Sequence, residues 1–324
     1  MTKPAYSKYK AWLRFSLEDV PPIIMMNIPT KKNTFLLLGM LCLLLASCSD
    51  SAAPIYQGSN IQILNASQTI ELETEFERFS YQLDTLDQGV PALILQSLPK
   101  DLPEITSNSA KKNIFFKSIL PMILLGNEEI RRERATVLGL KDKIDKGQPL
   151  SEQQQRQLET LAKRYQVKSD ALSSPPAIAE LLSRVDVIPP ELAMAQAANE
   201  SAWGTSRFSQ SANNLFGEWT FIPGTGIIPE GRPEGATYEV RRFESIYDSI
   251  RSYLLNLNSH YAYQELRQIR TVARVAGKPL NGSELAEGLF RYSIRGDDYV
   301  KDLQTLIRQN RLNRFAAVSL RVSS

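Results

Sequence analysis

Apolar and polar positions alternate at helical spacing through most of the chain from residue 110 onward. In residues 110–144 the charged residues lie opposite an apolar face, which predicts a long amphipathic helix. Its apolar positions, three or four residues apart, are Ile114, Phe115, Ile119, Met122, Ile123 and Ile130. Pro121 is expected to kink this helix or to end its first half, because proline has no amide hydrogen to donate.

Further helices are predicted, in chain order, at residues 151–167, 173–188, 189–202, 245–269, 281–293 and 297–312. Two of them begin with a serine that can cap the first turn. Ser151 has Gln154 three positions on, and Ser245 has Asp248 at the same spacing. The segment 189–202 is filled with alanine, leucine and methionine, so we expect it to be buried on most sides.

One stretch interrupts the helices. Residues 220–236 are rich in glycine and proline and cannot form a helix, whereas residues 237–243 alternate as a short strand does. The strand would be half of a hairpin. The predicted fold class is therefore mainly α (α+β), with a small β-hairpin excursion between the helix that ends near residue 202 and the C-terminal helices.

The N-terminus reads as an export signal. In residues 31–48 two lysines precede an apolar core that is shorter than the roughly 20 residues of a membrane-spanning helix, and small residues follow. Its last four residues resemble the bacterial lipobox, which implies that Cys48 is lipidated and becomes the first mature residue. Ser49 then favours the outer membrane, although Asp50 weakens that inference. An uncleaved membrane anchor is the alternative.

The predicted organisation has four parts. Residues 1–47 form the signal region, of which residues 1–24 precede a more usual start at Met25 or Met26. Residues 48–72 are the lipidated cysteine and a polar tether, 73–175 a helical N-terminal region, and 176–316 the catalytic domain. The expected location is facing the periplasm, anchored by lipid to the outer membrane of a Gram-negative bacterium.

Composition excludes several classes of chemistry. The formal charge of +3 and the scattered lysines and arginines do not favour nucleic-acid binding. The chain has one histidine, and both cysteines lie in the signal region at Cys42 and Cys48, which argues against disulfides, cysteine nucleophiles and cysteine-ligated zinc. We expect no cofactor and no metal, since the pair Asp297 and Asp298 alone is weak evidence for a metal site. Carboxylates, tyrosines and amides remain for chemistry.

Glu200 is the candidate acid. It is the one charged residue between Gln196 and Arg207, and it ends an apolar helical run. Trp203, three positions on, is expected to lie on the same helical face and cover the carboxylate, and Gly204 to turn the chain away. A carboxylic acid shielded in this way can keep its proton and donate it to a departing sugar oxygen. The alternative is a solvated surface residue.

The segment 193–219, AMAQAANESAWGTSRFSQSANNLFGEW, resembles the signature of the bacterial glucosaminidases of glycoside hydrolase family 73. Weaker likeness to the Bax-type branch extends over residues 110–312. The resemblance implies a lysozyme-like, mainly helical fold and an endo-β-N-acetylglucosaminidase that cleaves the β-1,4 bond after N-acetylglucosamine. The partner would be the glycan strands of peptidoglycan, and Glu200 would be the general acid.

The resemblance also implies a second acid on the β excursion. Glu230, Glu234 and Glu239 could match it. We favour Glu239, which lies on the predicted strand, and then Glu234, whose loop suits a lid. A separation from Glu200 of about 5–5.5 Å would indicate a nucleophile and roughly 6.5–9.5 Å an activated water. A larger gap would favour the acetamido group of the substrate.

Other residues are candidates for the substrate groove. Tyr292 resembles the family tyrosine that faces the catalytic glutamate, with a core tyrosine as the alternative, and for Tyr299 a structural role is favoured. Candidate substrate-binding residues, each with turn or core packing as the alternative, are Trp203, Asn213, Asn214, Phe216, Trp219 and Tyr299.

Two other functions stay open. A muramidase or lytic transglycosylase could use the same fold and the same glutamate on a different bond. A non-catalytic peptidoglycan-binding lipoprotein is the third reading, and it would not need Glu200.

Overall fold

The structure is a computed structural model that describes residues 61–169 and 171–321. The predicted signal region and the predicted lipidation site Cys48 lie outside these residues. From residue 61 on, the chain belongs to one compact unit, Ser59–Ser324. The unit is mainly helical with a small antiparallel sheet, which confirms the predicted fold class.

The helices and strands follow the chain in this order. The helices are α1 Thr69–Arg78, α2 Asn108–Asp145, α3 Glu152–Arg164, α4 Pro175–Arg184, α5 Pro190–Ser201, α6 Arg207–Ala212, α7 Ile246–Ser259, α8 Gln264–Val275, α9 Gly282–Leu285 and α10 Asp297–Gln309. The strands are β1 Gln62–Leu64, β2 Leu93–Leu95, β3 Trp219–Thr220, β4 Gly226–Ile227 and β5 Glu239–Arg241. Among the described residues, no helix is both long and apolar enough to cross a bilayer.

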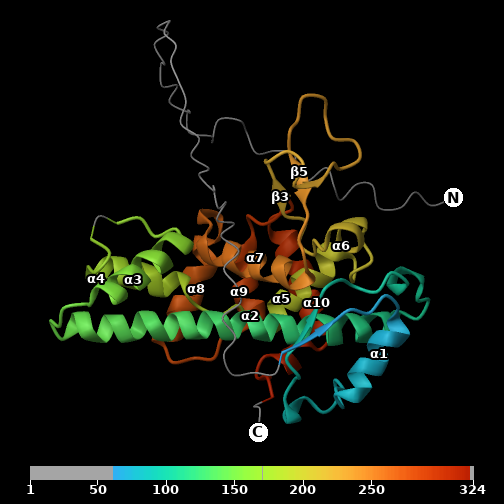
Figure 1. Ribbon diagram of the computed structural model, residues 1–324, viewed down its shortest axis with the longest axis horizontal. Helices are drawn as coiled ribbons and strands as arrows, with labels where there is room; N and C mark the ends of the chain where they lie inside the picture. The colour runs from blue at the N-terminus through green and yellow to red at the C-terminus, as the bar shows by residue number, and fades with distance from the viewer. Residues whose placement is uncertain (1–60, 170, 322–324) are drawn as a thin grey trace, which may run out of the picture. The chain divides into compact units, whose positions relative to one another are not determined.

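Helix α2 is the longest element, and the others are arranged along it (Figure 1). It runs across the whole view, with α3 and α4 toward one end and α1 toward the other. Helix α5 packs against α2, α9 and α10. Its residues from Pro190 to Ala198 are all buried, as the sequence predicted. The helix that carries Glu200 is therefore fixed on several sides.

Helix α2 continues through Pro121, although the sequence suggested a kink or an end there. Proline removes one backbone hydrogen bond from a helix interior. Around it, however, Ile119, Leu120, Met122 and Ile123 are fully buried. The burial of these side chains outweighs the local cost, because packing contributes more to helix stability than propensity does.

Local capping follows the prediction. The Ser151 hydroxyl accepts a bond from the Gln154 amide, and the Gln154 side chain accepts one from the Ser151 amide. Ser245 and Asp248 form the same reciprocal pair at the start of α7. Regular structure begins earlier than the expected tether boundary at residue 72, because β1 pairs in parallel with β2.

The β excursion contains a three-stranded sheet, one strand more than a hairpin. Strand β5 lies at its centre and pairs antiparallel with β3 and with β4. In Figure 1, β3, β5 and the loop before β5 project away from α2. The Asn214 side chain closes the root of the excursion, donating to the carbonyls of Glu218 and Arg241 and accepting from the Glu218 amide.

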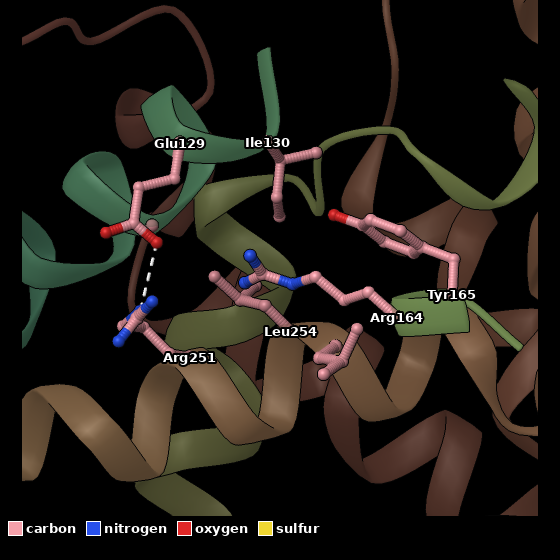
Figure 2. A pocket seen from close by; sticks show the side chains of 8 residues that line it. Glu129, Ile130, Arg164, Tyr165, Arg251 and Leu254 are labelled. Atoms are coloured by element: carbon pink, nitrogen blue, oxygen red, sulfur yellow. Dashed lines mark hydrogen bonds and ion pairs between the residues drawn. The ribbon is translucent and has the colours of Figure 1, made fainter. Parts of the chain in front are cut away.

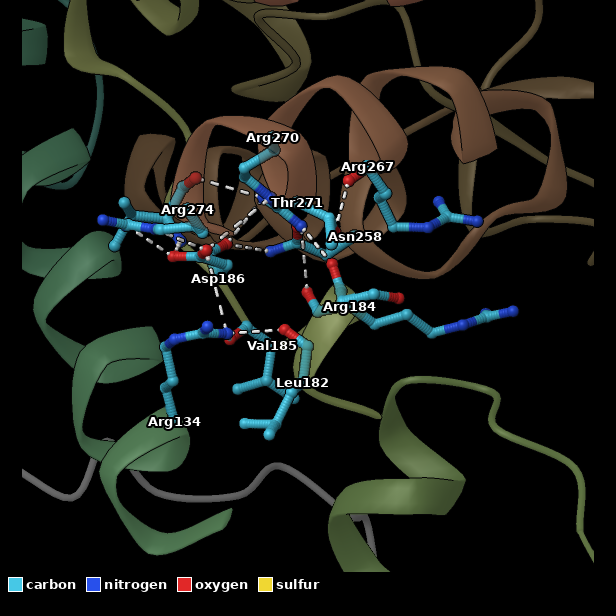
Figure 3. A network of polar contacts seen from close by, with 12 residues as sticks. Arg134, Leu182, Arg184, Val185, Asp186, Asn258, Arg267, Arg270, Thr271 and Arg274 are labelled. Carbon is cyan, nitrogen blue, oxygen red and sulfur yellow. Dashed lines mark hydrogen bonds and ion pairs between the residues drawn. The ribbon is translucent and has the colours of Figure 1, made fainter. Parts of the chain in front are cut away.

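A buried ionic network ties the helices together (Figure 3). Asp186, which is 2% exposed, accepts two hydrogen bonds from Arg274, at 2.9 and 2.8 Å. Arg134 from α2 lies 3.7 Å from the same carboxylate. Burial raises the pKa of Asp186, but the Arg274 hydrogen bonds and the charges of Arg270 and Arg134 outweigh burial, so the pKa is lowered. The carboxylate thus stays ionised between α2 and α8.

A second cluster joins α2 to α7 and α3 (Figure 2). Glu129 of α2 points toward Arg251 of α7, with the Oε2 and Nε atoms 3.0 Å apart. Glu133, one turn on, accepts bonds from Arg164 at 2.6 Å and from the Tyr165 hydroxyl. These contacts set the angle at which α7 and α3 leave α2.

Candidate active site

Glu200 lies in the last turn of α5 and is half-buried. The Tyr299 hydroxyl of α10 donates to Glu200 Oε1 at 2.8 Å, and the Asn199 side chain donates to the same oxygen at 3.0 Å. The carboxyl group is therefore held in place by side chains. It is not a freely rotating surface residue.

A chain of hydrogen bonds extends behind this contact into the core. Gln196 Nε2 donates to the Tyr299 hydroxyl at 3.0 Å, and the Tyr253 hydroxyl donates to Gln196 Oε1 at 2.6 Å. Burial raises the pKa of Tyr299 and Tyr253 well above the usual tyrosine value, and the Glu200 charge adds to the effect. Both hydroxyls hence keep their protons and act as donors.

Tyr292 and Tyr299 exchange the parts that the sequence suggested. The ring of Tyr292 stacks on that of Tyr299, with centroids 5.4 Å apart and planes 4° apart, so Tyr292 backs the residue that bonds Glu200. The Tyr292 hydroxyl lies 3.5 Å from the Phe216 carbonyl oxygen. Burial, followed by the Glu200 charge, raises its pKa well above the usual value. Tyr292 thus lies close enough to Glu200 to feel its charge, and Tyr299 donates a hydrogen bond to it.

The turn after Glu200 explains the small residues of the motif. Ala202, Trp203 and Gly204 all have positive φ, at 50°, 60° and 78°. The Ser201 hydroxyl donates to the Ala197 carbonyl and accepts from the Gly204 amide, which stabilises the turn. A Cβ atom on Gly204 would lie 2.6 Å from Leu98 Cδ1, so this position requires glycine.

The expected cover of Glu200 by Trp203 is wrong in its geometry. Helix α5 ends at Ser201 with Ala202 in the left-handed conformation, so the three-residue spacing no longer places both side chains on one helical face. The Trp203 ring packs edge-on against Phe115 and Phe116 of α2, at 5.9 and 5.5 Å. Trp203 therefore anchors the turn to α2.

The paired asparagines hold the backbone. The Asn214 side chain makes three hydrogen bonds to main-chain groups, and the residue is 1% exposed. Asn213 ends α6 in the left-handed conformation and donates to the carbonyls of Phe243 and Glu244. For Asn214 this corrects the glycan-binding hypothesis, because its amide is used inside the fold.

The two aromatic candidates differ in exposure. Phe216 is 4% exposed and stacks on Tyr253, with centroids 3.9 Å apart, which places it in the core. Trp219, in β3, is half-buried and stacks on Tyr238 at 4.3 Å. Trp219 is thus the better candidate of the two for a surface that a sugar ring could reach.

The three acids expected on the excursion lie in different surroundings. Glu239 is 7% exposed, and its carboxylate accepts from the amides of Gly224 at 3.0 Å and Gly226 at 2.8 Å. These bonds, that of Gly224 first, lower the pKa of Glu239. Glu230 is exposed and forms a 2.6 Å ion pair with Arg207, and Glu234 is exposed in the loop before β5.

Glu218 is an acid that the sequence reading missed. It directly precedes β3, and its carboxylate accepts from the Ser252 hydroxyl at 2.7 and 2.9 Å and from Arg241 at 2.6 Å. Its charge acts on the hydroxyls of Tyr263 and Tyr292, and so does that of Glu200. The two carboxylates therefore have the same pair of tyrosines as neighbours. The available signal was its place directly after the Asn-Asn-Leu-Phe-Gly turn.

Comparison with known proteins identifies the family. Residues 175–312 match the family described as mannosyl-glycoprotein endo-beta-N-acetylglucosaminidase, or glucosaminidase. Protein bax of Escherichia coli (strain K12) is 32% identical over 214 residues, which are 66% of this chain and 74% of that protein. The chain belongs to the glucosaminidase family.

A solved structure also resembles this glucosaminidase family member. The catalytic domain of the autolysin Auto from Listeria monocytogenes shares 17% identity with it, over 56% of this chain and 86% of that one, with a TM-score of 0.30. At that level the likeness carries no argument about the site. The matched family region, in contrast, contains Glu200, Glu218, Glu239, Tyr292 and Tyr299.

Proposed function

We propose that the protein is a peptidoglycan hydrolase that cleaves the β-1,4 bond after N-acetylglucosamine, with Glu200 as its general acid. Family membership supports the class of reaction. The observation that supports Glu200 as the general acid is the hydrogen-bond chain from Tyr253 through Gln196 and Tyr299 to Glu200 Oε1. Such a chain fixes the carboxyl group in one orientation, which proton transfer to a bound substrate requires.

Tyr299 and Asn199 both donate to Oε1 and so fix the orientation of the Glu200 carboxyl group. In its protonated form this group carries the proton to be transferred. That proton moves to the glycosidic oxygen as the bond to the anomeric carbon breaks. The carboxylate left behind is stabilised by the same two donors, because hydrogen bonds to a charged acceptor are stronger than those to a neutral one.

Glu218 is our candidate for the second acid. In this role it takes a proton from the water whose oxygen bonds to the anomeric carbon. Arg241 and Ser252 keep it in one position, and its charge, like that of Glu200, raises the pKa of Tyr263 and Tyr292. Glu239 is the alternative from the sequence. Its donors are backbone amides of the excursion, whereas those of Glu218 are side chains, and Glu234 is exposed in the loop.

The first experiment separates an enzyme from a binder. Purified sacculi are incubated with the wild type and with Glu200→Gln, and both solubilisation and co-sedimentation are measured. We expect solubilisation to fall by about 10²–10⁴-fold in the variant, the usual contribution of a general acid, while binding persists. Unchanged solubilisation would contradict the role of Glu200. No solubilisation by either protein, with binding retained, would favour a non-catalytic binder.

We also propose that the protein faces the periplasm, anchored to the outer membrane through Cys48. The support is the lipobox-like end of residues 31–48. Metabolic labelling with a fatty-acid analogue should label the wild type and not Cys48→Ala. Equal labelling of both proteins, or none of either, would contradict the anchor without affecting the proposed reaction.

A further inference from the structure

A pocket of about 400 Å³ lies between α1 and the N-terminal half of α2, away from the candidate active site. It is lined by Glu73, Glu77, Gln82, Ser109, Ala110, Asn113 and Lys117. In Figure 1, α1 lies on the side of α2 opposite to β3 and β5. A ligand here would therefore not compete for the space beside Glu200.

Lys117 is the unusual member of this set. Its side chain lines the pocket, yet the residue is only 6% exposed. Its ammonium nitrogen lies 4.6 Å from the centroid of the Phe76 ring. Within the part of the chain that the structure describes, it makes no hydrogen bond and no ion pair. Burial lowers the pKa of Lys117, although the charges of Glu73 and Glu77 act in the opposite direction.

Most of the Lys117 side chain is buried, and its ammonium group has no anionic partner within ion-pair distance among the described residues. Charged groups that lose water are usually paired, because removal from water is costly. The contact with Phe76 offsets only part of that cost. The pocket is open enough to admit a partner from solution. A carboxylate is the simplest group that would complete the pair.

Two glutamates restrict which anion can enter. Glu73 and Glu77 lie four residues apart on α1, so their side chains are neighbours on one helical face, and both are exposed. They repel a simple anion and attract a cation, whereas Lys117 does the reverse. A ligand that satisfies both ends must carry a carboxylate and an ammonium group close together.

We propose that this pocket binds the zwitterionic end of an amino acid, with its carboxylate on Lys117 and its ammonium group between Glu73 and Glu77. Asn113 and Ser109 supply further hydrogen-bonding groups at the wall. The ligand can be a free amino acid or an amino-acid end in the peptide stem of peptidoglycan. The second source rests on the proposed function, and the first does not.

Helix α2 connects this pocket to the catalytic helix. Phe115 and Phe116, directly before Lys117, contact Trp203 in the turn after Glu200. A stem peptide held at Lys117 would thus bind to the helix that supports the catalytic turn.

Calorimetric titration of the full chain tests the proposal with defined probes. These are D-alanine, meso-diaminopimelate, a synthetic stem tetrapeptide, and acetate and ethylamine as half-ligands. We expect at least one zwitterion to bind the wild type, and Lys117→Met to weaken that binding tenfold or more. Lys163→Met, at an exposed lysine of α3, is the matched control and should bind as the wild type does. Acetate and ethylamine should each bind at least tenfold more weakly than the zwitterion.

Failure of the expected zwitterion binding overturns the proposal. Absence of zwitterion binding to the wild type, or equal binding by Lys117→Met, would make Lys117 a structural lysine only. If Lys117→Met does not fold, the double variant Glu73→Gln and Glu77→Gln at exposed positions must show the same tenfold loss. Tighter binding of the tetrapeptide than of D-alanine would identify the stem as the source, and the reverse a free amino acid. Glu200→Gln should bind the zwitterion normally, so failure here is distinct from failure of the proposed reaction.

Discussion

Glu200, an acid of the helical core, and Glu239, an acid of the β excursion, are both held by hydrogen-bond donors, but the donors differ. Glu200 is held by Tyr299, which is 99 residues away in the chain and belongs to the helical core. Glu239 is held by the amides of Gly224 and Gly226, which are 15 and 13 residues away within the excursion. The core thus positions one acid through packing between distant helices, and the excursion positions the other through local backbone bonds.

The two sets of donors point to different roles for Glu200 and Glu239. Glu239 accepts two backbone amides of its own excursion, which gives that loop a defined conformation. Glu200, our proposed general acid, is held instead by side chains, one of them from a distant helix of the core.

The largest difference in activity is expected between the variants Glu218→Gln and Glu239→Gln. If Glu218 activates water, its variant should lose about 10²–10⁴-fold in kcat, the range for a general base, with the melting temperature unchanged. Glu239→Gln should retain most of kcat. Turnover of purified sacculi by both variants, with thermal unfolding as the control, measures this. A larger loss of kcat in Glu239→Gln than in Glu218→Gln would identify Glu239 as the second acid.

Asp186→Asn should destabilise the core while it leaves the excursion intact. Removing one partner of a buried ion pair costs about 3–5 kcal/mol, because here Arg270, Arg274 and Arg134 would lose their counter-charge. Denaturant unfolding at neutral pH gives the size of the loss. Arg134→Met should cost less, because Arg134 lies 3.7 Å from the carboxylate and its side chain is 22% exposed.

The same residue predicts how stability depends on pH. The folded-state pKa of Asp186 is lowered, so its contribution is complete above the unfolded-state pKa of about 3.9 and is lost as pH falls through the folded-state value. The wild type should lose stability in this acid range, and Asp186→Asn should lose less of it. Parallel acid titrations that follow unfolding would refute the assignment if both proteins lost equal stability.

Tyr299→Phe should have a smaller effect, confined to activity. Phenylalanine keeps the stack on Tyr292 but removes the hydrogen bond to Glu200. A hydrogen bond to a charged group contributes about 1.5–3 kcal/mol, which corresponds to a loss of roughly tenfold or more in kcat. Tyr253→Phe, two hydrogen bonds farther from Glu200, should lose less. Equal losses of kcat in both variants would mean that the hydrogen-bond chain acts as a structural unit and does not orient Glu200.

The smallest effect is expected in the excursion itself. In Glu239→Gln one carboxylate oxygen is replaced by an amide NH₂, which cannot accept both backbone bonds. Amide hydrogen exchange at Gly224 and Gly226 should become several-fold faster, with the exchange of α5 and α10 unchanged. Faster exchange across the whole chain would show that the excursion is not an independent unit.

The sequence predicted best what depends on neighbours in the chain. The capping pairs at Ser151 and Ser245 are correct because all their atoms lie within one helical turn. The interruption at Pro121 did not occur, since buried packing on both sides of it holds α2 straight through. Local rules describe caps well and long-range packing poorly.

The site shows the same limit. Glu200 could be singled out from its motif, but the choice between Tyr292 and Tyr299 depends on how α10 packs against α5. Glu218 escaped notice because its partners, Arg241 and Ser252, lie 23 and 34 residues away. Trp203 was misplaced because the left-handed turn at Ala202 is set by tertiary contacts to Phe115 and Phe116.

The most direct test of the central claim is mass analysis of the fragments released from purified sacculi by the wild type and by Glu200→Gln. Our account predicts fragments that end in reducing N-acetylglucosamine from the wild type and almost none from the variant. Fragments that end in reducing muramic acid or anhydro-muramic acid would contradict the proposed bond, and equal release by both proteins would contradict the role of Glu200.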